Sequence, residues 1–284
     1  MTFESNLTYN FQTLKMTIKD KMPLFHSTFV ARLLMGLIIV SFISCKDNDD
    51  TPLAEVNPSF NFTHNWDGVP IQNSDYENTT YVNENGESLT LSKLVYLISD
   101  ITFSDAQGNI FSAGDYNLID AREGINLNFA PDVTLEEGTY NVSFTFGFDD
   151  EDNAGDYPDL NTADGGVWIV PMMLGGGYHY MKLEGKYTDT QTIPSSEVGF
   201  AYHAIRANDN STDPITLQDT SFIVNLGEVV VSAGTEIKIQ MNVAEWFKNP
   251  HTWNLDELYM MLMPNFQAQI LMSENGANGV FTKG

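Results

Sequence analysis

The chain has 284 residues, of which 42% are hydrophobic and 12% aromatic, a composition typical of a folded protein with a sizeable core. Its 13 Lys and Arg residues stand against 38 Asp and Glu residues, and the net charge of −25 excludes the basic surface that nucleic-acid binding requires. Cys45 is the only cysteine, which excludes an internal disulfide, a Cys-rich zinc site and an iron–sulfur cluster.

The N-terminal segment has the layout of an export signal. Residues 33–44 are an apolar run, too short for a membrane-spanning helix of about 20 residues. Lys19, Lys21 and Arg32 precede the run, as is typical of a signal peptide. Cys45 follows it directly and resembles the lipidated cysteine of a bacterial lipobox; the alternative is a plain signal peptide with an incidental cysteine.

Residues 46–50 (Lys-Asp-Asn-Asp-Asp) resemble the acidic export signal of Bacteroidetes surface lipoproteins. We therefore expect 1–45 to be a signal peptide with a lipobox cysteine and 46–55 to be an acidic tether. On this interpretation the protein is an outer membrane lipoprotein, held by a lipid anchor at the cell surface or on the periplasmic face. Its folded domain runs from 56 to 284.

The folded domain carries mainly strand patterns. The clearest are 140–148 and 236–243, in which apolar and polar residues alternate. Further strand patterns lie, in chain order, at 57–64, 88–104, 115–120, 177–187, 198–205 and 217–232. Helical patterns are confined to 244–248, 255–263 and 265–275. The sequence predicts an all-β fold, an antiparallel β-sandwich with long loops and a few short helices.

The longest stretch without a pattern, 149–173, is a candidate functional loop. Its first part, 149–159, is rich in Asp and Glu and is a candidate calcium site, because Ca²⁺ takes carboxylate and carbonyl oxygens as ligands. Its spacing departs from that of an EF-hand, so the alternative is a solvated run of charges.

Two histidines lie in strand patterns with apolar neighbours. In a strand, His179 would share a face with Met181, and His203 would share one with Ala201 and Ile205. Neutral imidazole is a good copper ligand, and thioethers favour Cu(I). The alternative is that each is a core histidine whose ring is satisfied by backbone hydrogen bonds.

Several motifs together resemble the MbnP-like copper-binding domain family, with its MbnP and MopE types. They are FTHNWDGVPI at 62–71, LTLSKLVYLISDI at 89–101, YNLID at 116–120, FGFD at 146–149, GYHYMKLEG at 177–185, His203, SENG at 273–276 and GVF at 279–281. The resemblance implies an exported β-sandwich that binds copper through two histidines and an oxidised tryptophan, kynurenine. It also implies a di-haem peroxidase-like partner that generates the kynurenine.

The resemblance makes His179 and His203 the first candidate ligands. His64, which lies in the opening motif, is a further candidate that could instead cap a strand end. His251 is expected on an exposed loop, away from the metal.

The third ligand stays open. Members of the family often carry a tryptophan just before Gly-Tyr, where this chain has Met172 and Met173. The nearest indole is that of Trp168. Either Trp168 takes the role, or the methionines supply a ligand, or this branch of the family has lost copper.

The sequence carries no nucleophile motif, phosphate-binding loop or dinucleotide fingerprint, so we expect a protein that is not an enzyme. The predicted function is an exported lipoprotein that binds copper, as Cu(I). The alternative is a metal-free surface adhesion or glycan-binding module, in which Trp66, Trp168 and Trp253 would stack on sugars.

Overall fold

The computed structural model describes residues 53–191 and 193–284. The chain divides into two compact units, Met1–Asp50 and Thr51–Gly284, and the described residues belong to the second. The predicted signal peptide, Cys45 and most of the predicted tether therefore lie outside the described residues. Within those residues, no helix is long and apolar enough to cross a membrane.

The larger sheet is antiparallel, with β5 at its centre. Its strands are β4 (Tyr81–Val82), β5 (Ser88–Ser104), β6 (Ile110–Ser112), β7 (Tyr116–Asp120), β10 (Gly138–Phe146), β11 (Met181–Asp189), β12 (Ser196–Ala204) and β15 (Phe222–Val231). The order across it is β12-β11-β5-β10-β15, while β4, β6 and β7 pair with β5. The long β5 pairs with β11 near one end and with β10 near the other.

The smaller sheet contains the parallel pairing of β2 with β16. Its strands are β2 (Ser59–Trp66), β3 (Val69–Pro70), β8 (Asn128–Phe129), β16 (Glu236–Asn242) and β17 (Phe281–Lys283). Two short pairs complete the described strands: β1 (Glu55–Val56) with β9 (Leu135–Glu136), and β13 (Ala207–Asp209) with β14 (Thr216–Gln218).

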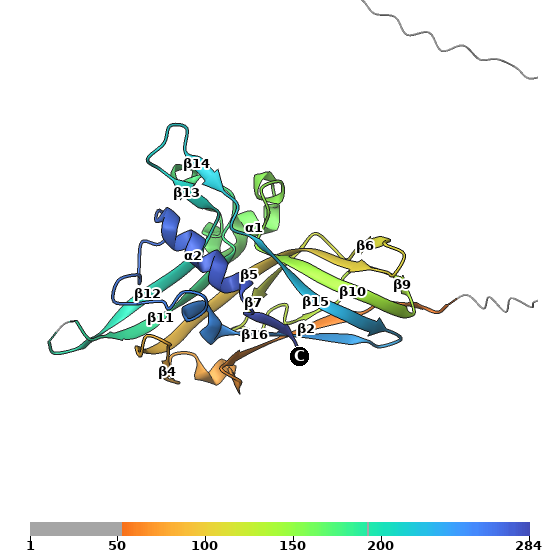
Figure 1. Cartoon of the computed structure of the whole chain (residues 1–284), viewed down its shortest axis with the longest axis horizontal. Helices are drawn as coiled ribbons and strands as arrows, with labels where there is room; N and C mark the ends of the chain where they lie inside the picture. Colours follow the sequence, from red (N-terminus) through yellow and green to blue (C-terminus); the bar gives the residue numbers. More distant parts are fainter. Residues whose placement is uncertain (1–52, 192) are drawn as a thin grey trace, which may run out of the picture. The chain divides into compact units, whose positions relative to one another are not determined.

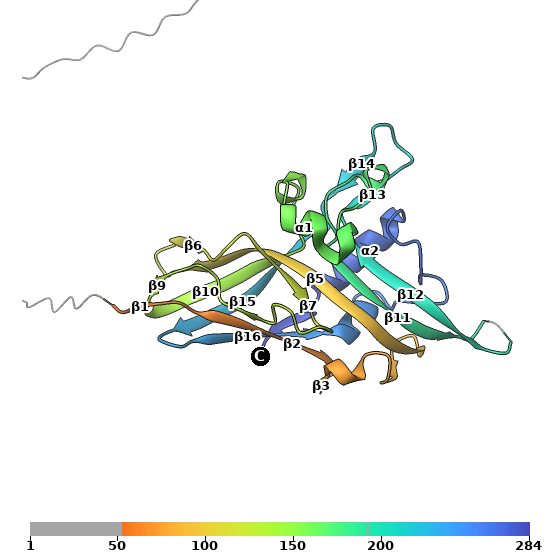
Figure 2. The same ribbon diagram turned by 180° about the vertical axis from the view of Figure 1, so that it is seen from behind.

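The two sheets face each other across an aromatic core. Both views show β2 and β16 as a layer beside β5 and β10 (Figures 1 and 2). Ring centroids lie 5.9 Å apart for Phe60 on β2 and Phe103 on β5, and 5.4 Å apart for Phe144 on β10 and Phe281 on β17. Burying each such ring stabilises the fold by about 1.5–3 kcal/mol, so these contacts hold the layers together.

The helices are short and lie outside the sandwich. They are α1 (Pro158–Thr162) and α2 (Phe266–Ala277), with 3₁₀ turns η1 (Asn73–Asp75), η2 (Asp152–Ala154), η3 (Ala163–Gly166), η4 (Met172–Leu174) and η5 (Val243–Phe247). Asn265 caps α2 by accepting a hydrogen bond from the Ala268 N–H (3.1 Å). The helix packs against β12, β13 and η5 and so covers one end of the larger sheet (Figure 1).

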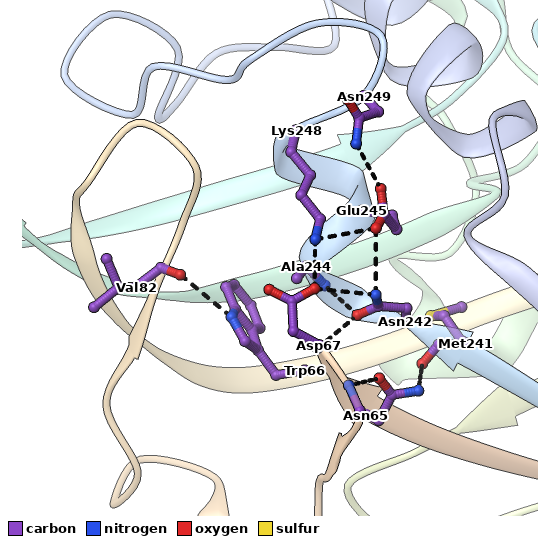
Figure 3. A network of polar contacts seen from close by, with 11 residues as sticks. Asn65, Trp66, Asp67, Val82, Met241, Asn242, Ala244, Glu245, Lys248 and Asn249 are labelled. Carbon is purple, nitrogen blue, oxygen red and sulfur yellow. Dashed lines mark hydrogen bonds and ion pairs between the residues drawn. The ribbon is translucent and has the colours of Figure 1, made fainter.

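A polar network ties the end of β2 to the end of β16 (Figure 3). The Asn242 side chain accepts hydrogen bonds from the N–H groups of Asp67 (2.9 Å) and Ala244 (3.3 Å). Lys248 forms ion pairs with Asp67 and with Glu245, the second at 3.0 Å. These contacts fix the turn after β2 against η5, so the two parallel strands end in register.

The predicted all-β sandwich is confirmed, and its clearest strand patterns form β10 and β16. The pattern at 265–275 forms α2. In contrast, 255–263 forms turns instead of a helix. Met261 has a left-handed backbone (φ 58°) and Pro264 disfavours helical geometry at the residue before it, so a helix cannot continue there.

Two strand predictions differ from the structure by more than two residues at one end. The pattern 217–232 is divided between β14 and β15. The pattern 177–187 becomes a strand only from Met181 onward, because Gly175, Gly176 and Gly177 all have positive φ and turn the chain before it enters the sheet. As a result, His179 precedes β11.

Candidate metal centre

The candidate ligands lie where β11 and β12 pair. Lys182 and His203 are opposite each other in the register. The Tyr180 N–H donates to the Ala204 carbonyl (2.8 Å) and continues the pairing beyond the start of β11. His179 follows one residue further out, and its ring centroid is 5.4 Å from that of His203, with the planes at 80°.

The histidine pair lies on the outward face of the larger sheet. The side chains of β12 that enter the core are those of Phe200, Tyr202 and Ala204. Since successive side chains alternate, His203 points the other way, beside Lys182 and Glu184. His203 thus lies between the polar side chains of Lys182 and Glu184 and an apolar pocket that Ala201 also lines. The prediction that its strand face is apolar is correct only in part, because this face is mixed.

Trp168 belongs to the segment that covers this face. Its side chain is 0% exposed, and its carbonyl accepts hydrogen bonds from the His179 N–H (3.0 Å) and from His179 Nδ1 (2.9 Å). The ring centroids of Trp168 and His179 are 5.7 Å apart. A bridge between Ile169 and Tyr178 holds the two stretches side by side. The structure thus brings Trp168, His179 and His203 together.

The hydrogen bond to Trp168 sets the tautomer of His179. A carbonyl only accepts, so Nδ1 carries the proton and Nε2 carries the lone pair. Nε2 is buried and has no hydrogen-bond partner among the described residues. Burial lowers the pKa of His179 to about 3, so the ring is neutral at physiological pH. The result is a neutral ring nitrogen whose lone pair is available to bind a metal ion.

Glu184 orients His203 in a similar way. His203 Nε2 lies 2.9 Å from Glu184 Oε1, and this hydrogen bond lowers the pKa of Glu184. Because a carboxylate only accepts, Nε2 is the donor and Nδ1 of a neutral ring carries the lone pair. A carboxylate behind an imidazole is a common arrangement around metal ligands.

Trp168 has an unpaired donor in the same place. Its indole N–H is buried without a hydrogen-bond partner in the described part of the chain. Such an unpaired group costs about 1–3 kcal/mol, and the ring that carries it is 5.7 Å, between centroids, from the ring of His179. Two neighbouring rings, each with an unpaired polar atom, mark this cluster as a candidate site.

Charge around the cluster is balanced. The buried Lys182 ammonium donates to Asp164 (2.8 Å) and to the Val167 carbonyl (2.7 Å), and lies 5.4 Å from the centre of the Trp168 ring. Lys93 also pairs with Asp164, at 3.0 Å. The carboxylates of Asp164 and Glu184 therefore offset the positive charge that would oppose a bound cation.

The two predicted methionine ligands are both exposed but have different neighbours. Met172 and Met173 in η4 are 82% and 74% exposed. Met173 lines a pocket that His203 also lines, whereas the sulfur of Met172 lies against Gly176. Of these two methionines, only Met173 shares a pocket with His203.

The other histidines lie in separate environments. His64 on β2 is buried, its Nε2 is 3.1 Å from the Tyr96 hydroxyl, and burial lowers its pKa to about 4. His251 pairs with Glu274 at a partly exposed position. Neither lines the pocket beside His203.

The acidic loop is held by its own contacts. Asp149 accepts hydrogen bonds from the N–H groups of Glu151 and Asp152 (both 2.9 Å), and Asp150 pairs with Arg206 (3.1 Å). Burial raises the pKa of Asp152 to about 6, and nearby carboxylates add to this effect. Within the described ranges, no three or more His, Cys, Asp or Glu side chains form a group that could hold a metal ion, so the calcium prediction gains no support.

Sequence reasoning missed Glu184 and Lys182, which lie beside the histidines only because of the register between β11 and β12. It also missed three methionines after β16, at 260, 261 and 263, that share the pocket with His203. The run Met-Met-Leu-Met at 260–263 was the available signal in the sequence.

Fold and site together define a class: an all-β sandwich protein with a candidate metal centre made of two imidazoles beside an indole. The sequence model of the MbnP family matches residues 55–264. The chain therefore belongs to the MbnP family, which is associated with copper and with exported proteins.

Other comparisons are more distant. A solved structure, MbnP from Methylosinus trichosporium, is similar at 13% sequence identity with a TM-score of 0.41, over 70% of this chain and 80% of that one. No curated protein matches the sequence.

Proposed function

We propose that this protein is an exported copper-binding protein in which His179 and His203 hold a Cu(I) ion beside Trp168. The observation that carries the proposal is the Nε2 atom of His179, a buried lone pair with no hydrogen-bond partner among the described residues. A purely structural histidine would pair that atom, as His64 does with Tyr96. Membership of the MbnP family supports copper as the metal.

The spacing of the two rings fits one shared ion. A metal about 2 Å from an imidazole nitrogen lies about 3 Å from the ring centre, and the centroids are 5.4 Å apart. Zn²⁺ in proteins takes at least three side-chain ligands, and no such set of His, Cys, Asp and Glu occurs in the part of the chain that the structure describes. Two imidazoles suit copper better.

Trp168 is the proposed third component. An indole N–H is only a donor, so the unmodified side chain offers the ion no lone pair from its nitrogen. The family resemblance implies oxidation of a tryptophan to kynurenine by a di-haem peroxidase-like partner, and Trp168 is the indole beside His179. Kynurenine carries an amine and a ketone, both able to bind a metal.

The proposal includes export and anchoring. The signal peptide layout and Cys45 support an outer membrane lipoprotein that faces the cell surface or the periplasm and binds copper without catalysing a reaction. Replacing Cys45 by Ala should move the protein from the membrane to the soluble fraction; unchanged membrane association would contradict lipidation at this residue.

The alternative, a sugar-binding module, requires exposed tryptophan rings that could stack on a glycan. Trp66, Trp168 and Trp253 are all buried, so none presents a ring face to a glycan. Copper binding is therefore the function that the geometry supports best.

Competition with a Cu(I) chelator on the soluble Cys45→Ala protein tests the metal. We expect about one tightly held ion per chain in the parent, and loss of tight binding in His179→Ala and in His203→Ala. His251→Ala is the matched control and should bind like the parent. Mass spectrometry of the Trp168 peptide, in protein made with and without the partner, detects kynurenine. A parent that holds no copper even with Trp168 oxidised would overturn the proposal.

A further inference from the structure

A pocket of about 410 Å³ opens beside the histidine pair, and methionines dominate its wall. It is lined by Met173, Leu174, Ala201, His203, Met260, Met261, Leu262, Met263 and Pro264. The sequence has eight methionines after residue 52, and half of them meet here from two segments almost ninety residues apart. No carboxylate or ammonium belongs to this lining.

The methionines are held in an exposed position. Met173, Met260 and Met261 are 74%, 53% and 77% exposed, although burial of apolar side chains is favourable. Met261 also has a positive φ of 58°, a conformation that is costly for a residue with a side chain. Neither burial nor backbone preference therefore explains this loop.

Hydrogen bonds fix the loop that carries these methionines. The Ala201 N–H donates to the Tyr259 carbonyl (2.7 Å), the Asn208 side chain to the Met263 carbonyl (2.9 Å), and the Gln269 side chain to the Leu262 carbonyl (3.0 Å). All three contacts are to the backbone, so the thioethers stay free while the loop is anchored on both sides of Met261.

The chemistry of the lining selects a soft cation. Thioethers are weak, polarisable donors that suit Cu(I) and are poor ligands for Mg²⁺ and Ca²⁺. His203 forms part of this lining and also belongs to the histidine pair. A metal ion held by the thioethers would thus have an imidazole of the proposed centre as a neighbour.

We propose that this methionine pocket is a second Cu(I) site, through which copper enters and passes by way of His203 to the centre with His179. Its role as an entry route rests on the proposed function; its binding of a soft cation does not. Transfer is ligand exchange without a change of oxidation state: bonds from copper to sulfur break as bonds to imidazole nitrogen form.

Titration with Ag(I), a redox-inert soft cation, tests binding directly. In protein labelled at the methionine methyl carbons, we expect the NMR signals of Met173, Met260, Met261 and Met263 to shift. Met172 is the matched control, because it is 82% exposed yet outside the pocket. Its signal should not move. The pocket signals should still shift in His179→Ala, which removes the proposed centre but leaves the thioethers.

Loading kinetics test entry. The triple variant Met260→Leu, Met261→Leu and Met263→Leu keeps apolar volume and removes three sulfurs; it should take up Cu(I) several-fold more slowly than the parent and reach the same final affinity. Met172→Leu should load like the parent.

The outcomes separate the two proposals. If the NMR signals of the pocket methionines do not shift with Ag(I), or if the Met172 signal shifts equally, the pocket is not a metal site even if the parent binds copper. If the pocket signals shift while the parent lacks a tight Cu(I) site, the pocket binds a soft cation and the proposed function is wrong. Equal loading of parent and triple variant would overturn the entry route.

Discussion

His64 and His179 are both buried neutral imidazoles, yet their surroundings differ in one respect. Burial lowers the pKa of both, to about 4 and about 3. Nε2 of His64 meets the Tyr96 hydroxyl, whereas Nε2 of His179 has no partner among the described residues. A lowered pKa therefore does not separate a structural histidine from a candidate ligand; an unused lone pair beside a second imidazole does.

The largest contrast should come from truncating each histidine. His64→Ala removes a hydrogen-bonded core side chain and should lower the free energy of unfolding by about 2–4 kcal/mol while copper affinity is retained. His179→Ala should lose tight copper binding. Urea unfolding and chelator competition on both variants measure the two effects. Loss of copper binding in a folded His64→Ala protein would contradict the assignment of His64 as structural and His179 as the ligand.

Acid should destabilise the fold through both rings. Each folded-state pKa lies below the ordinary histidine pKa of 6.5, so between these pKa values the unfolded chain binds protons that the folded chain does not bind. The contribution of each ring is fully present above pH 6.5 and is lost as the pH falls towards 4 and 3. For His64 the full loss is on the order of 3 kcal/mol.

Urea midpoints at pH 7 and pH 5 check this dependence. The pH effect should be smaller in His64→Phe, which keeps an apolar ring in the core. Copper binding should respond differently to acid. Because the pKa of His179 is low, protons compete with copper for this ring only in strong acid. An equal pH effect in parent and His64→Phe would contradict the assignment to His64.

The smallest of these effects concerns the carboxylate behind His203. Glu184→Gln replaces an acceptor by an amide that no longer fixes the tautomer, and copper affinity should fall by about 10–100-fold with little change in stability. Glu197→Gln is the matched control, because Glu197 lies on β12, the strand that carries His203, and pairs only loosely with Lys186, at 3.9 Å. Equal copper affinity in parent and Glu184→Gln would show that this carboxylate does not position the ring.

The sequence allowed prediction of the sandwich but not of its site geometry. Alternation along β10 and β16 is a local property, so strands and fold class follow from it. The resemblance supplied Trp168, His179 and His203. The side of the sheet on which they meet depends on the three glycines at 175–177 and on the register that sets Lys182 opposite His203. Such long-range pairing leaves no trace in local periodicity.

The parallel pairing of β2 with β16 also constrains the order of folding. β2 ends at Trp66, and its partner begins at Glu236, so the smaller sheet cannot form until most of the chain has been synthesised. Contacts between residues so distant in sequence slow folding. A fragment that stops after β15 would leave Phe60 and Phe62 without the neighbouring strand that covers them. We therefore expect the nascent chain to stay unfolded until its last quarter emerges, and to need protection from aggregation until then.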